Sequence, residues 1–527
     1  MDVASAQLIS ALQNVQCYPH PVSRVRLVET HISWVLLTGQ YVYKIKKPVL
    51  FTFVDFSTLK KRRWFCEEEV RLNRRLAPQL YLGVVPITGS PSKPQIDGEG
   101  SPIEFAVKMK QFLSDHEFSK LLSAGEIDEQ VMRQLADCIG KFHNWIEPAQ
   151  ETSSYGVPDM VWQSMEECFG EIPLDILPFP IQQYLHQIKE WTRQEWHTMR
   201  IVLEQRKSSG FIRECHGDLH LGNIALSEGQ ICVFDALEFE PRLRWIDVIS
   251  EAAFLVMDLE SKDRVDLAYL FLNRYLEVTG DYAGMTVFRL YEVYRALVRA
   301  KVAGLRLAQV EKGSLEWENI CGEMIEYVEL AHRLIRPSPP MLILMHGVSG
   351  TGKTTVSTEV MKTLGAIRVR SDVERKRISG EKNERAVREE IKESLYAPAM
   401  TQATYARLLD LANTMLKAGY STVVDATFLR VAQRQPFIQL AHDRQFSFVI
   451  LDVWAPEEVL AERIKWRARQ GTDASDATIA VMERQRAQED PLNEAEQAYT
   501  IHINSTNSKS IQSARRDLIE QRESRDH

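Results

Sequence analysis

The chain has 527 residues, of which 44% are hydrophobic and 26% charged, and its formal net charge is −8. This length provides for about three domain-sized units with large cores, and the composition excludes a disordered or fibrous protein. The longest apolar runs, such as 252–257 and 341–345, are too short to span a bilayer, so no transmembrane helix is expected.

Residues 1–24 lack a basic start followed by an apolar stretch, so no signal peptide is expected. The seven cysteines include no C-x-x-C pair, which indicates reduced thiols and a cytoplasmic protein. Residues 341–527 hold 27 basic and 26 acidic residues, so the acidic excess lies in the rest of the chain. That distribution argues against nucleic acid as a partner and says nothing of the oligomeric state.

The first clear element in chain order is a β-hairpin over 35–46, where two apolar, β-rich runs meet at Thr38-Gly39. A helix is expected over 60–76, and it carries three consecutive glutamates at 67–69. The next segments are read as a hairpin loop, a strand and a hinge, at 86–102, 103–109 and 110–113. Helical periodicity then dominates over 130–204 and 246–334.

Between these helical stretches lies the motif Cys215-His-Gly-Asp-Leu-His-Leu-Gly-Asn223, and a short apolar strand after it ends in Asp235. Kinase-like folds use a carboxylate that accepts the hydroxyl proton, an Asn five residues later, and a second Asp on the next hairpin that holds metal ions. Asp218, Asn223 and Asp235 have that spacing. The alternative is a polar turn between two buried strands, which needs no such spacing.

The His-Gly-Asp form of the motif resembles the aminoglycoside-phosphotransferase and choline-kinase branch of the protein-kinase superfamily. This resemblance implies an α+β, protein-kinase-like bilobal domain with a helical large lobe. It implies that Asp218 is the catalytic base and that Asn223 and Asp235 bind Mg²⁺.

The same resemblance implies a strand lysine that grips the nucleotide phosphates and a helix glutamate that orients it. Lys44 is the preferred lysine, but Lys46 lies on the same face of the strand and stays an alternative. Glu69 is the preferred glutamate of the three. The sequence departs from the kinase pattern because no G-x-G-x-x-G precedes Lys44. Hydroxyl or backbone N–H groups of residues 29–33 must then hold the β/γ-phosphates, and the choice between ATP and GTP at this site stays open.

A proline-rich segment at 336–340 precedes a second pattern, in which an apolar strand at 341–345 leads into G-x-x-x-x-G-K-[ST]. Its glycines let successive N–H groups face a polyphosphate, Lys353 reaches the β/γ-phosphates, and Thr354 offers a hydroxyl to Mg²⁺. The alternative is an accidental glycine turn. The apolar strand before the motif and the helix expected after it favour the phosphate-binding interpretation. We therefore expect this phosphate-binding loop (P-loop) to bind nucleotide through Gly347, Val348, Ser349, Gly350, Thr351, Gly352, Lys353, Thr354 and Thr355.

Beyond the P-loop, strands are expected over 366–370, 420–424 and 446–453, alternating with helices. That order implies an α/β domain with a parallel sheet and ligands at the carboxyl ends of its strands. This part resembles small P-loop kinases of the gluconate, shikimate, polynucleotide 5′-kinase and zeta-toxin types. The resemblance implies that Asp372 orients or deprotonates the acceptor hydroxyl and that Asp425 holds Mg²⁺ or assists the base.

The resemblance also implies a lid whose arginines contact the transferred phosphate. Arg463 and Arg467 are the preferred lid residues, Arg469 is a further candidate, and Arg375 is placed to meet an anionic substrate. A solvated helix face is the alternative for the arginines, and a helix N-cap is the alternative for Asp372.

The whole order resembles bacterial bifunctional aminoglycoside phosphotransferase/ATP-binding proteins. It implies an ATP- and Mg²⁺-dependent phosphotransferase with two kinase sites for hydroxyls of small molecules, such as sugars, aminocyclitols, nucleosides or sugar nucleotides. The rival hypotheses are a nucleotide-dependent regulatory switch and polynucleotide 5′-kinase or zeta-toxin-like activity of the C-terminal domain. The predicted parts are a small lobe, a large lobe, a linker and a P-loop kinase domain, at 1–115, 116–335, 336–340 and 341–527.

Overall fold

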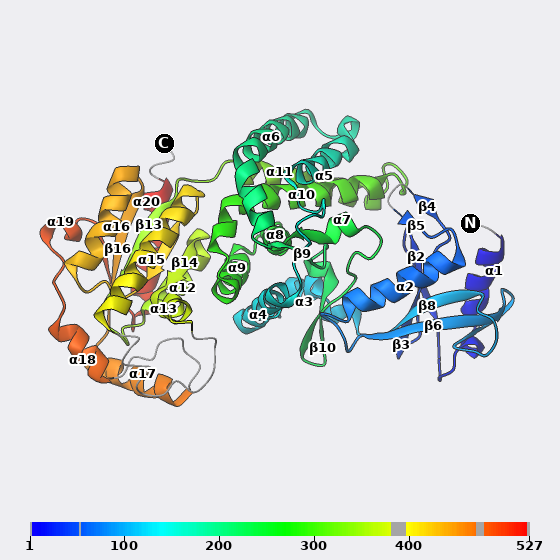
Figure 1. Cartoon of the computed structure of the whole chain (residues 1–527), viewed down its shortest axis with the longest axis horizontal. Helices are drawn as coiled ribbons and strands as arrows, with labels where there is room; N and C mark the ends of the chain where they lie inside the picture. The colour runs from blue at the N-terminus through cyan, green and yellow to red at the C-terminus, as the bar shows by residue number, and fades with distance from the viewer. Residues whose placement is uncertain (1–2, 52–53, 381–396, 471–478, 524–527) are drawn as a thin grey trace. The chain divides into compact units, whose positions relative to one another are not determined.

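The computed structural model describes residues 3–51, 54–380, 397–470 and 479–523, with side chains left out at 467–470 and 523. The chain divides into two compact units, each described separately below (Figure 1). The first unit comprises Met1–Glu167 and Leu203–Asp258, and the second comprises Cys168–Val202 and Leu259–His527. No helix among the described residues is long and apolar enough to cross a membrane.

The first unit begins with an antiparallel sheet in the order β1-β2-β3-β8-β6-β7. Strands β2 and β3 form the predicted hairpin, which turns through Gly39 with φ +93°. Part of the segment predicted as a hairpin loop, 86–102, is instead strand, because β7 pairs with β6 as an edge strand, where prolines are tolerated. The strands are β1 Arg26–Glu29, β2 Ser33–Leu37, β3 Tyr41–Lys46, β6 Tyr81–Ser90, β7 Lys93–Ile96 and β8 Glu104–Lys110.

The two faces of strand β3 serve different purposes because side chains alternate along a strand. Tyr43 and Ile45 enter the core that helix α1 (Val3–Leu12) covers. Lys44 and Lys46 point to the opposite face, where helix α2 (Leu59–Asn73) carries Glu69. The sheet thus presents both lysines to one glutamate.

The motif residues lie between short strands in the rest of the first unit. Residues 215–223 connect β9 to β10, and Asp235 follows β11. Strand β9 pairs with β12 and β10 pairs with β11. The remaining elements that lie wholly or partly in this unit are β4 Leu50–Phe51, β5 Val54–Asp55, α3 Phe118–Ala124, α4 Glu129–Trp145, α5 Pro158–Glu171, α6 Phe179–Ser208, β9 Ile212–Glu214, β10 Ile224–Ser227, β11 Gln230–Val233, α7 Pro241–Arg244, β12 Trp245–Asp247 and α8 Val248–Glu260.

The second unit is built on a parallel sheet in the order β14-β15-β13-β16-β17. The strands are β13 Met341–His346, β14 Ile367–Arg370, β15 Thr422–Asp425, β16 Ser447–Trp454 and β17 Thr500–Asn504, of which β17 was not predicted from the sequence. Helices α12 and α20 pack on one face, and α15 and α16 lie on the other (Figure 1). The helices of this part are α12 Lys353–Leu364, α13 Ser371–Ile378, α15 Pro398–Lys417, α16 Val431–Arg444, α17 Glu457–Gln470, α18 Ile479–Ala487, α19 Glu494–Gln497 and α20 Ser508–Glu523.

Helices that precede the proline-rich segment also pack in the second unit. They are α9 Val265–Thr279, α10 Met285–Leu307 and α11 Leu315–Leu334. Helix α9 lies against α12 and β14, and α10 lies against α15. Residues on both sides of the proline-rich segment at 336–340 therefore pack in the same unit.

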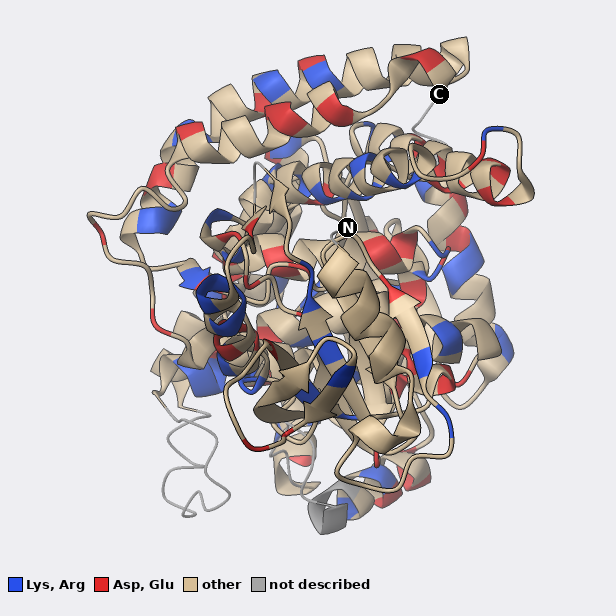
Figure 2. Cartoon of the chain, turned by 90° about the vertical axis from the view of Figure 1, so that its right-hand side faces the viewer, with Lys and Arg blue, Asp and Glu red and all other residues tan. Residues whose placement is uncertain are grey.

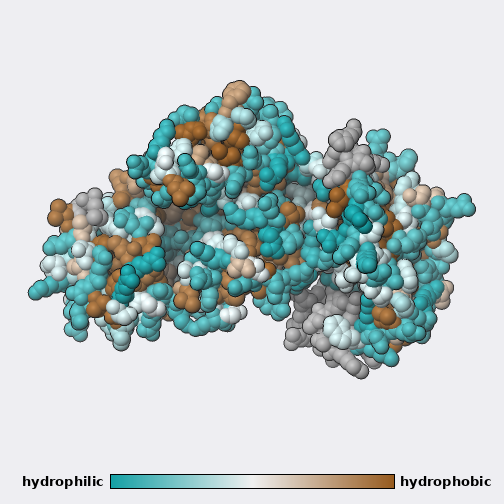
Figure 3. Space-filling view, turned by 180° about the vertical axis from the view of Figure 1, so that it is seen from behind, coloured by the Kyte–Doolittle hydropathy of each residue, from teal (hydrophilic) through white to brown (hydrophobic). Residues whose placement is uncertain are grey.

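Charged and apolar residues are mixed over the visible surface. Basic and acidic segments are interspersed along the helices in Figure 2. On the face seen in Figure 3, hydrophobic areas are small and scattered among hydrophilic atoms.

Candidate active sites

The loop that carries Asp218 is held in place by buried hydrogen bonds. The ring Nε2 of His216 lies 2.9 Å from the carbonyl oxygen of Phe234, and the N–H of Gly217 donates to Glu251 Oε1 at 2.6 Å. Burial lowers the pKa of His216, so this ring is neutral and its Nε2 carries the hydrogen that the carbonyl accepts. Gly217 has φ +91°, and a Cβ there would meet the carbonyl oxygen of Leu243 at 2.9 Å. The motif therefore requires glycine at this position.

Glu251 anchors the same loop from helix α8. Its Oε2 lies 2.8 Å from Nε2 of His143. Burial raises the pKa of Glu251, but the hydrogen bond and charge of His143 outweigh it and bring the pKa to about 2. The carboxylate is thus charged when it accepts the Gly217 N–H. No local motif marks Glu251, which lies 33 residues after Asp218.

Asp218 and Asn223, which are five residues apart, contact each other. Asn223 Nδ2 donates to Asp218 Oδ2 at 2.9 Å, and His220 Nε2 lies 3.3 Å from the same oxygen. The Asp218 side chain is 29% exposed. A carboxylate that is fixed by neighbours and still reached by solvent can accept a proton from a bound hydroxyl.

Lys44 and Lys46 both contact Glu69, but their surroundings differ. Lys44 Nζ lies 2.9 Å from Glu69 Oε1 and 2.5 Å from Asp235 Oδ1, whereas Lys46 Nζ lies 2.7 Å from Glu69 Oε2 and 2.5 Å from Glu238 Oε1. The Lys46 side chain is fully buried. Burial raises the pKa of Glu69, but both lysines lower it more strongly, to about 2. Of the two lysines, Lys44 is the one that reaches a half-exposed residue of the predicted metal site.

The side chains around Asp235 suit a hard divalent cation. Asp235 offers carboxylate oxygens, and Asn223, whose amide nitrogen binds Asp218, offers an amide oxygen. Oxygen ligands of this kind are those that Mg²⁺ prefers. Asp235 also has φ +65°, an uncommon conformation for a residue with a side chain, of the sort that clusters at functional sites. The residues therefore fit Mg²⁺.

The P-loop has the backbone that its glycines predict. Gly347 and Gly352 have φ +128° and +94°, and a Cβ on Gly347 would meet the carbonyl oxygen of Val453 at 2.4 Å. Lys353 Nζ donates to the carbonyl of Val348 at 2.8 Å. Helix α12 begins at Lys353, so its N-terminal N–H groups face the same region as the lysine. Such a loop is shaped to bind a polyphosphate.

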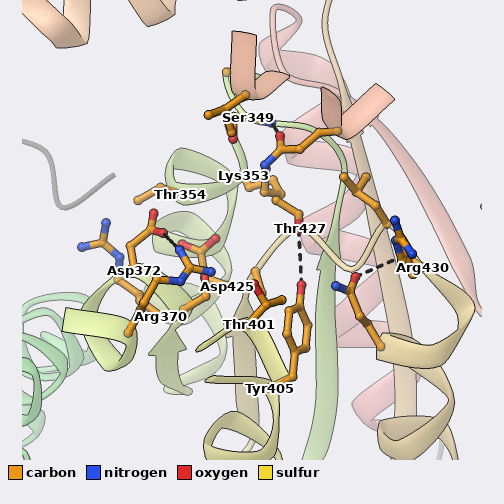
Figure 4. A pocket seen from close by; sticks show the side chains of 18 of the residues that line it. Ser349, Lys353, Thr354, Arg370, Asp372, Thr401, Tyr405, Asp425, Thr427 and Arg430 are labelled. Atoms are coloured by element: carbon orange, nitrogen blue, oxygen red, sulfur yellow. Dashed lines mark hydrogen bonds and ion pairs between the residues drawn. The ribbon is translucent and has the colours of Figure 1, made fainter. Parts of the chain in front are cut away.

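A pocket at the carboxyl ends of β13, β14 and β15 brings the predicted residues together (Figure 4). Lys353, Thr354, Asp372 and Asp425 all line it. Asp425 is buried and accepts from Ser357 Oγ at 3.1 Å. The remaining predicted P-loop residues in the lining are Ser349, Gly350 and Gly352; Gly347, Val348, Thr351 and Thr355 do not line it.

Asp372 lies in the first turn of α13, and Arg375 Nη1 donates to its Oδ1 at 2.9 Å. The cap residue of α13 is Arg370, so the alternative that Asp372 is an N-cap is wrong. Strand β14 ends at Arg370, and α13 begins at the next residue, Ser371.

Arg463, expected in a lid, contacts the backbone of the P-loop. Its Nη1 donates to the carbonyls of Gly350 and Thr351, at 3.3 and 3.2 Å, and to Ser505 Oγ at 2.9 Å. It does not line the pocket. The side chains of Arg467 and Arg469 lie outside the described residues. Contact of these arginines with phosphate stays a prediction.

The structure adds pocket residues that the sequence did not single out. Arg370 could have been found, because it ends a predicted strand. Arg430 and Arg484 are contributed by the start of α16 and by α18. Tyr405 on α15 lies with its hydroxyl 3.3 Å from Thr427 Oγ1 (Figure 4). These three lie on helices or loops with no local motif.

Two family models match different parts of the chain. Residues 65–290 match a model described as the phosphotransferase enzyme family, and residues 342–492 match one described as an AAA domain. Uncharacterized proteins of Mycobacterium tuberculosis and Mycobacterium bovis are 29% identical to it over 480 residues, which is 89% of this chain and 92% of theirs.

Two solved structures are similar to parts of the chain. A choline/ethanolamine kinase family protein from Mesorhizobium loti is 8% identical and covers 63% of this chain and 98% of its own, with a TM-score of 0.36. A gluconokinase from Sinorhizobium meliloti is 17% identical and covers 36% of this chain and 100% of its own, with a TM-score of 0.26.

Proposed function

We propose that this chain, which combines a phosphotransferase-family, kinase-like region with a P-loop kinase-like domain, transfers phosphoryl groups at two sites. Each site uses ATP and Mg²⁺ to phosphorylate a hydroxyl group of a small molecule. The observation that carries the proposal is that Asp372 lines the same pocket as Lys353 and Thr354. The proposed proton acceptor and the phosphate-binding lysine thus line one cavity.

At the P-loop site, backbone N–H groups and Lys353 hold the β- and γ-phosphates. Asp372 orients the acceptor hydroxyl and takes its proton as the oxygen attacks the γ-phosphorus, and the bond from that phosphorus to the ADP oxygen breaks. Thr354 and Asp425 would hold Mg²⁺, which neutralises charge that builds up on the phosphate oxygens. Arg370 and Arg375 add positive charge to the wall beside Asp372.

At the N-terminal site, Asp218 plays the proton-accepting role and Lys44 binds the nucleotide phosphates. Glu69 orients Lys44 through the 2.9 Å contact. Asn223 and Asp235 would hold Mg²⁺. Phosphoryl transfer at such a site depends mainly on positioning and charge, which these fixed side chains supply.

The test is transfer of ³²P from γ-labelled ATP to a fractionated pool of small metabolites. The wild-type chain, Asp218→Asn and Lys353→Ala are compared, because each variant disables one site. We expect labelled products in the wild type, with a different set missing in each variant. Nucleotide binding at both sites without any labelled product would instead support a regulatory switch. Label on added polynucleotide 5′-ends would favour the end-repair alternative.

A further inference from the structure

Helix α9, which lies upstream of the proline-rich segment, covers the open edge of the P-loop sheet. Strand β14 is the first strand in the sheet order, so its outer backbone groups have no neighbouring strand among the described residues. Asn273 takes the place of such a strand. Its Nδ2 donates to the carbonyl of Ala366 at 3.0 Å, and its Oδ1 accepts from the N–H of Arg368 at 2.5 Å. The contact fixes the register between α9 and β14.

One turn further along α9, Glu277 faces the same strand. Residues four apart lie on one side of a helix, so Glu277 follows Asn273 toward the carboxyl end of β14. Its Oε1 lies 3.2 Å from Arg368 Nη2 and 3.7 Å from Arg370 Nη1, and only 2% of its side chain is exposed. Arg377 Nη2 also donates to the Glu277 carbonyl at 2.6 Å. A single buried carboxylate thus joins two arginines of β14.

The two arginines lead to different parts of the P-loop site. Arg370 lines the pocket beside Asp372 (Figure 4). Arg368 Nη1 donates to Thr358 Oγ1 at 2.7 Å and lies 3.4 Å from Ser357 Oγ, both on the P-loop helix. Ser357 in turn donates to Asp425. Contacts therefore run from Glu277 to both the acceptor side and the metal side of the pocket.

We propose that Glu277 is a positioning residue of the P-loop site, which sets the orientation of Arg370 toward an acceptor bound beside Asp372. This inference rests on the proposed function. It means that a helix within the segment matched by the phosphotransferase model, 65–290, packs behind a strand that lines the P-loop pocket. The residue acts through Arg370 and does not itself line the pocket.

The charge that this role requires persists in the folded chain. Burial raises the pKa of Glu277, but Arg368, Arg370 and Arg274 outweigh it and keep the pKa below its usual range. An ionised carboxylate holds a guanidinium more strongly than a neutral group of the same shape. The isosteric change Glu277→Gln therefore removes the charge and keeps most of the packing.

The first experiment measures the position of Arg370 without any substrate. The full chain is treated with phenylglyoxal, and labelling of each arginine is followed by peptide mass spectrometry. In Glu277→Gln we expect Arg370 to react several-fold faster, while Arg375, which is bound by Asp372, serves as the internal reference. Asp266→Asn, a change to a partly exposed carboxylate in the first turn of the same helix, is the matched control. Equal labelling of Arg370 in wild type and Glu277→Gln overturns the inference, as does an equal rise in Asp266→Asn.

The second experiment uses the acceptor whose labelling depends on Lys353. Loss of one charge-assisted contact to Arg370 should raise the acceptor KM roughly tenfold and leave ATP binding nearly unchanged. In an Arg370→Ala background, Glu277→Gln should add no further rise, because its effect passes through that arginine. An additive rise contradicts the inference. If no acceptor is found, the proposed function fails, and the labelling result still decides the role of Glu277.

Discussion

At the scale of single residues, the N-terminal site separates two lysines that the sequence presents as near equivalents. Both contact Glu69, because alternate residues of β3 share a face. Lys46 is closed in by two carboxylates, Glu69 and Glu238, whereas Lys44 also reaches Asp235, whose side chain is 49% exposed. The arrangement supports Lys44 as the phosphate ligand and gives Lys46 a structural role.

This difference predicts opposite phenotypes for the two lysines. Lys46→Met leaves the buried carboxylate of Glu238 without its lysine and removes one of the two lysines at Glu69, so it should cost about 3–5 kcal/mol of stability. Lys44→Met should lower the unfolding midpoint much less and weaken nucleotide binding at this site. Thermal unfolding and calorimetric titration of a chain that also carries Lys353→Ala measure the two effects. Normal nucleotide affinity in Lys44→Met, with loss in a folded Lys46→Met, would reverse the assignment.

Asp372 gives a second prediction at this scale. Asp372→Asn keeps the shape of the side chain and removes the carboxylate that we propose takes the proton. Transfer at the P-loop site should fall at least roughly a hundredfold, with normal ATP affinity and a nearly normal unfolding midpoint. Asp443→Asn, an exposed change on α16, is the control. Near-full transfer by Asp372→Asn would move the base to Asp425.

The sequence predicts those residues whose chemistry depends on local spacing. Asp218 and Asn223 are five apart and meet, and the P-loop glycines have the φ values their pattern requires. Glu251 and Glu277 were not predicted, because each contacts its partner across a long interval of chain. A carboxylate in an amphipathic helix carries no local sign of the loop or strand it will face.

At the scale of elements, the predicted strands next to the P-loop are present, and the edge strand β17 was not anticipated. Thr500–Asn504 is short and carries a histidine and terminal polar residues, so its apolar signal is weak. It pairs in parallel with β16, which a local pattern cannot show. The contribution of helix α18, which supplies Arg484 to the pocket, could not be predicted either, because it depends on where the helix packs.

Helices α8 and α10 bring two carboxylates together in the second unit, with consequences for stability. Burial raises the pKa of Glu260 to about 7, against the opposing charges of Arg333 and Arg289. Burial and the nearby Glu260 raise the pKa of Glu292 well above its usual range. Its Oε1 is buried without a hydrogen-bond partner, as suits a neutral carboxyl group better than a charged one.

These raised values predict the direction of a pH effect. An acid whose folded-state pKa exceeds its unfolded value holds more protons when folded, so its contribution to stability falls as pH rises from about 4.5 to 7. Glu260→Gln removes this contribution. Relative to wild type, its unfolding midpoint should therefore rise by a few degrees as pH increases from 5 to about 7.5. A midpoint difference that stays constant over this range would show that Glu260 does not titrate there.

At the scale of the whole molecule, the proline-rich segment marks a change of sequence pattern without marking the edge of a packed unit. Asn273 and Glu277 on α9 bind β14, and Arg289 on α10 donates to the carbonyls of Ala418 and Gly419. The helical segment before the linker is therefore part of the support of the P-loop sheet. The linker was predicted from its proline content. Prolines show that a helix cannot continue through the segment, but they do not show which neighbouring elements pack together.

Nucleotide stoichiometry tests whether both sets of phosphate-binding residues operate in one chain. Lys44 and Asp235 belong to one unit, and Lys353 and Thr354 belong to the other. Titration of the nucleotide-free chain with Mg²⁺ and a non-hydrolysable ATP analogue should give about two bound nucleotides, one for each lysine-bearing site. Lys353→Ala and Asp235→Ala should each leave about one, and the double variant none. Because the remaining site in each single variant is unaltered, its affinity should match one of the two wild-type values. A single nucleotide in the wild type, lost in Lys353→Ala, would mean that the N-terminal residues do not form a nucleotide site.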